Sequence, residues 1–476
     1  MLRRATLAML LLAGCGDAPA PGGGTDSSGE PGSTANSGEP GGSTVPTTTM
    51  AEASSGEPGS GDGSGDGSTD GTGAPACDPD ARELVLRDFI PKDGARLDQQ
   101  LAPCSEDRWY FAAPSESTVA ITLRRKTGGV LSAVVAYPDE PAAQVWSAAL
   151  LPPIVSDASE QSAIFPVPRS GEFAVHVRSD AINPGVDGAA SYDLEIECIL
   201  GCERETTRFP ILLVHGWTGF ENIGPLTYFY NVADMLGELG YPHTIAVLDP
   251  YNSTEVRSGQ LALQLDEALA LWRARKVDLL GHSQGGIDSR AVVSSHGYGD
   301  RVSALMTIAS PHRGTYITDL ALGLAPGAVE EVVGALLNLV GAVTAQQKSD
   351  ALASFYSLSE QYMQEEFNPK NPDDPRVQYL SYTGRTCDAL AFLNPANDCK
   401  DLVDPLIGWS YALLQQARGD NDGLVTVDSA KWGEYRGEMI ADHIDEVGQI
   451  LGITDPKFDH LAFYRDRARE LAQAQH

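Results

Sequence analysis

The segment Gly-His-Ser-Gln-Gly-Gly at 281–286 has the clearest potential for chemistry. It fits the pattern Gly-x-Ser-x-Gly, in which a serine stands on a sharp turn between a strand and a helix. Small residues two positions to either side allow this turn, and the following helix points its N-terminal dipole at the hydroxyl. The apolar run Val277–Leu280 precedes the motif and a helical pattern follows it. Ser283 is therefore the predicted nucleophile of an acyl-transfer reaction.

A nucleophilic serine needs a histidine as its base, and that histidine needs a carboxylate that fixes its tautomer. On an α/β sheet the three follow the chain order serine, acid, histidine. Asp422 stands on a turn beside an apolar segment and is the predicted acid, while we expect its rivals Asp420 and Asp428 to be solvated. The histidines that follow the acid are His443, His460 and His476. We prefer His443 as the base because of the sequence around it, described below.

His215-Gly216-Trp217, at the end of the first apolar run of this region, fits a loop that stabilises an oxyanion. Acyl transfer develops negative charge on the carbonyl oxygen, which backbone N–H groups stabilise. We predict that these groups belong to Trp217 and to Gln284, the residue after the nucleophile. His215 precedes the nucleophile in the chain, so we expect it to brace the loop rather than to act as a base.

The elements that must position these residues begin at about residue 205, where apolar runs alternate with helical stretches, as in a parallel α/β sheet. The predicted strands are 211–214, 245–247, 277–280, 304–308 and 377–382, and the predicted helices are 231–239, 259–273 and 287–295. Residues 204–476 are therefore predicted to form the catalytic domain. In contrast, residues 77–203 contain short, alternating apolar runs separated by turns, which predicts a small all-β sandwich with a binding or a spacer role.

The N-terminal segment 1–15 is typical of an exported bacterial lipoprotein. Two arginines precede an apolar run of eight residues, too short to span a bilayer, and Leu-Ala-Gly-Cys at 12–15 resembles the lipobox that directs lipidation of the cysteine, here Cys15. An ordinary cleaved signal is the alternative. Residues 16–76 are rich in Gly, Ser, Pro and acids, so we expect a disordered tether. This organisation predicts a protein held at the bacterial cell envelope or surface, or released from it.

Composition excludes some partners. The chain of 476 residues carries 33 basic and 65 acidic side chains and a net charge of −32, which would repel nucleic acid and anionic lipid headgroups. Six cysteines remain besides Cys15, which allows up to three disulfides in an exported protein with fifteen possible connectivities. No Cys-x-x-Cys pair with zinc spacing occurs.

The segments 215–220, 281–286, 310–314, 421–425 and 442–447 resemble, in order and spacing, those of the bacterial family I true lipases. The resemblance covers 205 to the C-terminus, whereas 77–200 more weakly resembles pre-peptidase C-terminal β-domains. The lipase resemblance implies an α/β-hydrolase fold with a mostly parallel sheet, a triad, an oxyanion hole and a structural Ca²⁺. By position, the implied triad is Ser283, Asp422 and His443, and the implied calcium ligands are Asp404, Asp445 and the backbone carbonyls of Gln449 and Ile453.

The chain also departs from that family. Trp217 stands where Met or Leu is usual, which would narrow the acyl site. Val427 and Asp428 follow the acid turn where a cysteine is common, so Cys387 and Cys399 are the candidates for a relocated disulfide. An apolar helical stripe at 329–340 corresponds to the mobile lid of the family, with a core-packing helix as the alternative. The family resemblance also allows for a lipase-specific foldase as a partner.

Together these features predict an exported, lipid-anchored serine hydrolase of triacylglycerols or related lipid esters. A short-chain carboxylesterase or an acyltransferase of the same fold would share the triad and differ in acyl length and acceptor. A surface-binding lipoprotein with a non-catalytic hydrolase scaffold is a third alternative. A fluorophosphonate probe distinguishes these alternatives, because it labels an activated serine in the first two classes only.

Overall fold

The structure is a computed structural model that describes residues 82–156, 158–180, 189–217, 222–223, 226–326, 332, 334, 345–394, 399 and 401–474. The predicted signal segment with Cys15, the predicted tether 16–76 and most of the predicted stripe 329–340 lie outside the described residues. Among the described residues, no helix is both long and apolar enough to cross a membrane.

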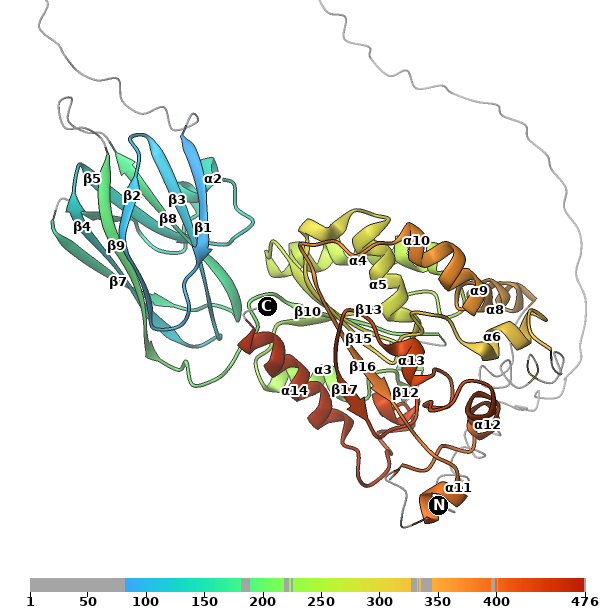
Figure 1. The fold of residues 1–476 in the computed structure, drawn as a ribbon. Helices are drawn as coiled ribbons and strands as arrows, with labels where there is room; N and C mark the ends of the chain where they lie inside the picture. The colour runs from blue at the N-terminus through green and yellow to red at the C-terminus, as the bar shows by residue number, and fades with distance from the viewer. Residues whose placement is uncertain are drawn as a thin grey trace, which may run out of the picture. The chain divides into compact units, whose positions relative to one another are not determined.

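The first described part is a β-sandwich (Figure 1). One sheet has the order β1 (Glu83–Phe89), β3 (Ser105–Ala113), β8 (Gly171–Asp180), β5 (Val130–Ala136) and β6 (Ile154–Ser156). The other has the order β2 (Gly94–Leu101), β9 (Ala190–Leu200), β4 (Thr118–Thr127) and β7 (Glu160–Pro166), and α2 spans Ala142–Ala148. Phe111, Phe165 and Phe173 meet in its core with ring centroids 5.2–6.2 Å apart. The short apolar runs that predicted an all-β sandwich here belong mainly to β3, β4, β5, β8 and β9.

The second part contains a six-stranded sheet in which every pair of neighbouring strands is parallel (Figure 1). Its order is β13 (His243–Ala246), β10 (Ile211–Val214), β14 (Val277–His282), β15 (Val302–Ile308), β16 (Gln378–Gly384) and β17 (Glu434–Met439). Successive residues of a strand face opposite sides of the sheet, and here apolar side chains on both sides pack against helices. The α/β-hydrolase fold predicted from the sequence is thereby confirmed.

Each face of this sheet has its own apolar core. Ile211 and Leu213 face α3 (Val232–Glu238) and α14 (His460–Gln473), whereas Leu212 and Val214 face α4 (Thr254–Trp272) and α5 (Gln284–Ser294). Figure 1 shows the two helix pairs on opposite sides of the sheet. Because both faces of β10 and β14 are buried, the positions of these strands in the sheet are fixed. The candidate site forms at their carboxyl ends.

The remaining elements lie mainly after β15. They are α6 (Tyr316–Ala321), α8 (Ala345–Ser357), α9 (Glu360–Tyr362), η3 (Met363–Phe367), α10 (Asn368–Lys370), α11 (Ala389–Leu393), α12 (Gly408–Ala417), α13 (Val427–Ala430) and η4 (Asp445–Val447), together with η2 (Tyr298–Asp300) and the short pair β11 (Asn222–Ile223) and β12 (Leu226–Thr227). Two disulfides are formed between described residues, Cys387–Cys399 and Cys198–Cys202, and Cys104 is also disulfide-bonded.

Candidate active site

Ser283 stands at the turn between β14 and α5. Its φ is +55° with ψ −129°, a backbone conformation that residues other than glycine rarely adopt. The turn is held by a hydrogen bond from the Ser283 N–H to the Ile308 carbonyl at 2.9 Å. A Cβ added at Gly285 would lie 2.3 Å from the Val214 carbonyl oxygen, so no larger residue fits there. These features are those of a strained strand-turn-helix elbow.

Asp422 and His443 form a buried hydrogen-bonded pair. The His443 Nδ1 atom lies 2.8 Å from Asp422 Oδ2, and the side chains are 8% and 1% exposed. The other oxygen of Asp422 accepts the N–H groups of Leu424 and Val425 at 2.8 and 2.7 Å. The His443 backbone N–H also donates to the Asp422 carbonyl at 2.9 Å. Two N–H donors therefore hold Oδ1 of the carboxylate, and a backbone bond joins the two residues, so that Oδ2 is oriented toward the imidazole.

His282 brings this pair beside the elbow. Its ring centroid lies 4.6 Å from that of His443, and it directly precedes Ser283. Hence the structure gathers the three residues of the predicted triad. Ser283 directly follows β14, Asp422 lies in the loop after α12, and His443 lies in the loop after β17. The rivals lie elsewhere: Asp420 and Asp428 are exposed, and His460 bonds the Tyr230 carbonyl from the start of α14.

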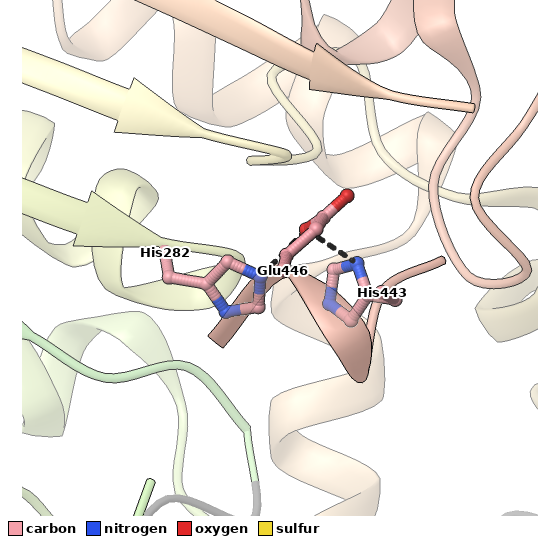
Figure 2. Close-up of side chains that lie close together, drawn as sticks. All are labelled: His282, His443 and Glu446. Carbon is pink, nitrogen blue, oxygen red and sulfur yellow. Dashed lines mark hydrogen bonds and ion pairs between the residues drawn. The ribbon is translucent and has the colours of Figure 1, made fainter. Parts of the chain in front are cut away.

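A second buried carboxylate, which sequence analysis did not identify, lies beside the Asp422–His443 pair. Glu446 Oε2 is 2.7 Å from His282 Nε2 and 3.7 Å from His443 Nδ1, so it lies between the two rings (Figure 2). Tyr228 bonds the other nitrogen of His282 at 2.6 Å. Burial, followed by the nearby Asp422 charge, raises the pKa of Glu446 well above its ordinary value. Burial lowers the pKa of His282, so that this histidine stays neutral.

The donor atoms of His282, His443 and Glu446 lie within 4.8 Å of one another, close enough to share a metal ion. Each group is already engaged, however: His282 and Glu446 bond each other, and His443 Nδ1 bonds Asp422. We therefore interpret these residues as a hydrogen-bonded network. The only sequence signal for Glu446 was its position three residues after His443, one turn of η4 away.

The predicted oxyanion loop is braced from beneath. His215 is fully buried, its Nε2 accepts the Leu248 N–H and its Nδ1 lies 2.9 Å from the Gly216 carbonyl. Arg257 of α4 donates to the His215 carbonyl at 2.6 Å and to Asp288 of α5 at 2.7 Å. Burial and the Arg257 charge lower the pKa of His215 to about 3. His215 is thus a neutral brace, as predicted.

Trp217 and Gln284 both adjoin the nucleophile. A Cβ added at Gly216, the residue before Trp217, would lie 2.6 Å from Ser283 Cβ. Gln284 is the first residue of α5 and fully buried. Its side-chain amide donates to the Asn252 carbonyl and its Oε1 accepts from the Ser354 hydroxyl, each at 3.0 Å. Both predicted oxyanion residues are therefore held next to Ser283.

The backbones of the two residues predicted as carboxylate ligands of calcium both bind the side chain of a third acidic residue, Asp442. Asp442 Oδ2 accepts the Asp404 N–H at 2.7 Å, and Oδ1 accepts the Asp445 N–H at 2.9 Å. All three are buried, as is Asp401, and the pKa of Asp442 is raised by burial and then by the charges of the other three. Gln449 and Ile453 lie in the turns that follow η4. Sequence analysis did not identify Asp401 and Asp442 as members of this acidic group.

Known proteins that are similar to this chain include several lipases. Residues 210–385 match the family model of palmitoyl protein thioesterases. The chain is 32% identical to a triacylglycerol lipase of Vibrio cholerae over 296 residues, which cover 56% of this chain and 89% of that protein. It is 26% identical to a triacylglycerol lipase of Pseudomonas fragi, with coverage of 56% and 97%. The Staphylococcus hyicus lipase structure is 18% identical, with coverage of 58% and 98% and a TM-score of 0.41.

The fold and these relatives define an ester hydrolase of the α/β-hydrolase class. Identity to the Vibrio cholerae enzyme over most of its length places the chain more narrowly. The chain belongs to the triacylglycerol lipase family.

Proposed function

We propose that the protein hydrolyses triacylglycerols or related lipid esters with Ser283 as nucleophile, His443 as base and Asp422 as the residue that orients His443. The observation that carries the proposal is the buried Asp422–His443 hydrogen bond of 2.8 Å beside the strained turn of Ser283. The names of the relatives in Vibrio cholerae and Pseudomonas fragi support the substrate class.

In this proposal the Ser283 hydroxyl attacks the ester carbonyl carbon while His443 Nε2 takes its proton. The carbonyl oxygen becomes negative and is stabilised by the backbone N–H groups of Trp217 and Gln284. His443 then gives the proton to the leaving alcohol, and water releases the acyl group by the same route. The negative charge of Asp422 stabilises the imidazolium that forms, and the two N–H donors on its other oxygen keep the carboxylate oriented toward His443.

The test is Ser283→Ala measured against Ser294→Ala, a half-buried serine at the end of the same helix. We expect the first variant to lose ester hydrolysis by a factor on the order of 10⁴ or more and to lose fluorophosphonate labelling. The second should keep both. Hydrolysis at the wild-type rate by a folded Ser283→Ala protein contradicts the proposal.

The substrate panel separates the alternatives. Triacylglycerols, short-chain esters and acyl thioesters are compared, with glycerol and with water as acceptors. Predominant thioester cleavage would instead favour the activity named by the matching family model. Acyl transfer to glycerol in preference to water would favour an acyltransferase.

We also propose that Asp404, Asp445 and the carbonyls of Gln449 and Ile453 hold a structural Ca²⁺. The donor set fits, because Asp401, Asp404, Asp442 and Asp445 place four buried carboxylates together and oxygen ligands suit this cation. Bound calcium would bring positive charge to this group of four acidic side chains. Asp445 follows His443 by two residues, so a fixed Asp445 also restricts the loop that carries the base.

The calcium proposal is tested by stability as well as by activity. A chelator should lower the melting temperature of the wild type, and calcium should restore it better than magnesium. Asp445→Asn should reproduce the loss, whereas Asp428→Asn, at a side chain that is 88% exposed, should not. A metal-free wild type with an unchanged melting temperature would remove the site and leave the triad proposal intact.

Anchoring at a membrane through Cys15 remains part of the proposal, supported by Leu-Ala-Gly-Cys at 12–15. Labelling with a lipid precursor should tag the wild type, and Cys15→Ser should lose both the tag and membrane association. Dependence on a dedicated foldase, which the family resemblance implies, is tested by refolding the denatured chain without added protein.

A further inference from the structure

Trp217 carries a bulky side chain and directly follows Gly216, whose backbone lies against the nucleophile Ser283. Because Gly216 leaves no room for a Cβ against Ser283, the first side chain on this side of the elbow is the indole of Trp217. Its ring lies 5.2 Å from that of Phe355 and 6.3 Å from that of Tyr251. The indole is therefore held between two aromatic neighbours on α8 and on the loop after β13.

The two aromatic neighbours are tied to the other oxyanion residue. Tyr251 directly precedes Asn252, whose carbonyl accepts from the Gln284 amide, and Phe355 directly follows Ser354, whose hydroxyl donates to Gln284 Oε1. The two segments that carry these rings are thus hydrogen-bonded to Gln284. Since the substrate carbonyl oxygen is proposed to bind between the N–H groups of Trp217 and Gln284, the attached acyl chain would begin close to the Trp217 indole.

Further apolar side chains lie beside Trp217. Trp217 packs on a cluster whose buried members are Ile317, Leu320, Ala321, Val332, Ala351, Phe355 and Leu414. These residues come mainly from α6, α8 and α12. An apolar cluster therefore lies on the side of Ser283 from which Trp217 comes, and a lipid chain requires an apolar environment of this kind.

We infer that Trp217 is the residue that limits acyl-chain length in this enzyme, so that short and medium acyl groups are preferred over long ones. The inference rests on the proposed function, because it assumes that the ester carbonyl binds beside Ser283. A rigid indole fixed by Phe355 and Tyr251 leaves less room than a flexible side chain at the same position.

The variant Trp217→Phe serves as a comparison for Trp217→Leu. Trp217 Nε1 is buried and has no hydrogen-bond partner among the described residues. Trp217→Phe therefore keeps an aromatic ring at this position and removes a donor that makes no bond there. Trp217→Leu removes the ring itself.

The test is a series of kcat/KM values on esters with one acyl group of 4, 8, 12 and 16 carbons, for the wild type and both variants. The readout is the ratio of kcat/KM on the 16-carbon to that on the 4-carbon ester, which cancels any shared change in rate. We expect a ratio below one for the wild type, an increase of at least tenfold in Trp217→Leu, and a smaller increase in Trp217→Phe, whose ring is smaller than the indole but larger than the leucine side chain.

A wild-type ratio above one, or an unchanged ratio in a folded Trp217→Leu protein, overturns the inference. If Trp217→Leu does not fold, Trp217→Met is measured in its place with the same expectations. Ser283→Ala is assayed on the same esters. Loss of its activity with an unchanged Trp217→Leu ratio rejects the inference alone, whereas retained activity rejects the proposed function.

Discussion

At the scale of single residues, the buried histidines need partners of the right kind. His215 accepts and donates one hydrogen bond each as a neutral ring, and His282 lies between Tyr228 and Glu446. Local sequence predicted Ser283, Asp422 and His443 because each belongs to a short motif. Glu446 and Arg257 were missed because their partners, His282 and Asp288, lie 164 and 31 residues away in the chain. No local sequence pattern indicates such a contact.

A pH dependence follows for His215. Its pKa is about 3 in the folded protein, below its value in the unfolded chain. The unfolded state therefore takes up a proton below about pH 6.5 and the folded state does not, so this residue costs stability progressively as the pH falls toward 3. His215→Gln keeps an acceptor for Leu248 but does not titrate. Chemical unfolding from pH 7.5 to 4 should show the wild type losing its stability advantage over the variant, and a constant difference would contradict this.

At the scale of elements, Arg257 links three pieces of the fold. From α4 its guanidinium reaches Asp288 on α5 and the carbonyl of His215 at the end of β10. Both members of the ion pair are completely buried, and burial raises the pKa of Asp288 to about 6 although Arg257 opposes this. The pair thus connects the nucleophile helix to the oxyanion loop.

Removing only one member of the Arg257–Asp288 pair should destabilise the fold more than removing both. Arg257→Met leaves a buried carboxylate without its cation and should lower the free energy of unfolding by about 3–5 kcal/mol. The double variant Arg257→Met/Asp288→Leu should lose less than the sum of the two single variants, because it removes both charges. Denaturant unfolding of all four proteins measures the coupling, and simple additivity would show that the pair is not a unit.

The elements also show which strands a sequence can reveal. Five strands of the parallel sheet were predicted because they are apolar runs, although β13, β14, β15 and β16 begin or end up to two residues beyond the predicted limits. The edge strand β17 was missed, since Glu-Tyr-Arg-Gly-Glu-Met is mostly exposed and has no apolar run. Its position depends on pairing with β16, which is a long-range contact.

At the scale of the whole molecule, charge opposes compactness. A net charge of −32 means that acidic groups repel one another across the surface. Sodium chloride screens this repulsion, because the Debye length falls from about 30 Å at 0.01 M to about 8 Å at 0.15 M salt. We expect the melting temperature to rise by a few degrees over this range with the metal content held constant. No change, or a decrease, would show that local ion pairs outweigh the net charge.

The backbone of Ser283 sets stability and activity against each other under selection. Its φ of +55° costs on the order of 1–3 kcal/mol for a residue with a Cβ, and glycine adopts this conformation freely. In a mutant library that is sorted only by survival of heating, Ser283→Gly should therefore be enriched, while the same library sorted by ester hydrolysis should eliminate it. Sequencing both pools would reveal opposite ranks at this codon. A protein selected for durability alone would thus tend to lose its nucleophile first.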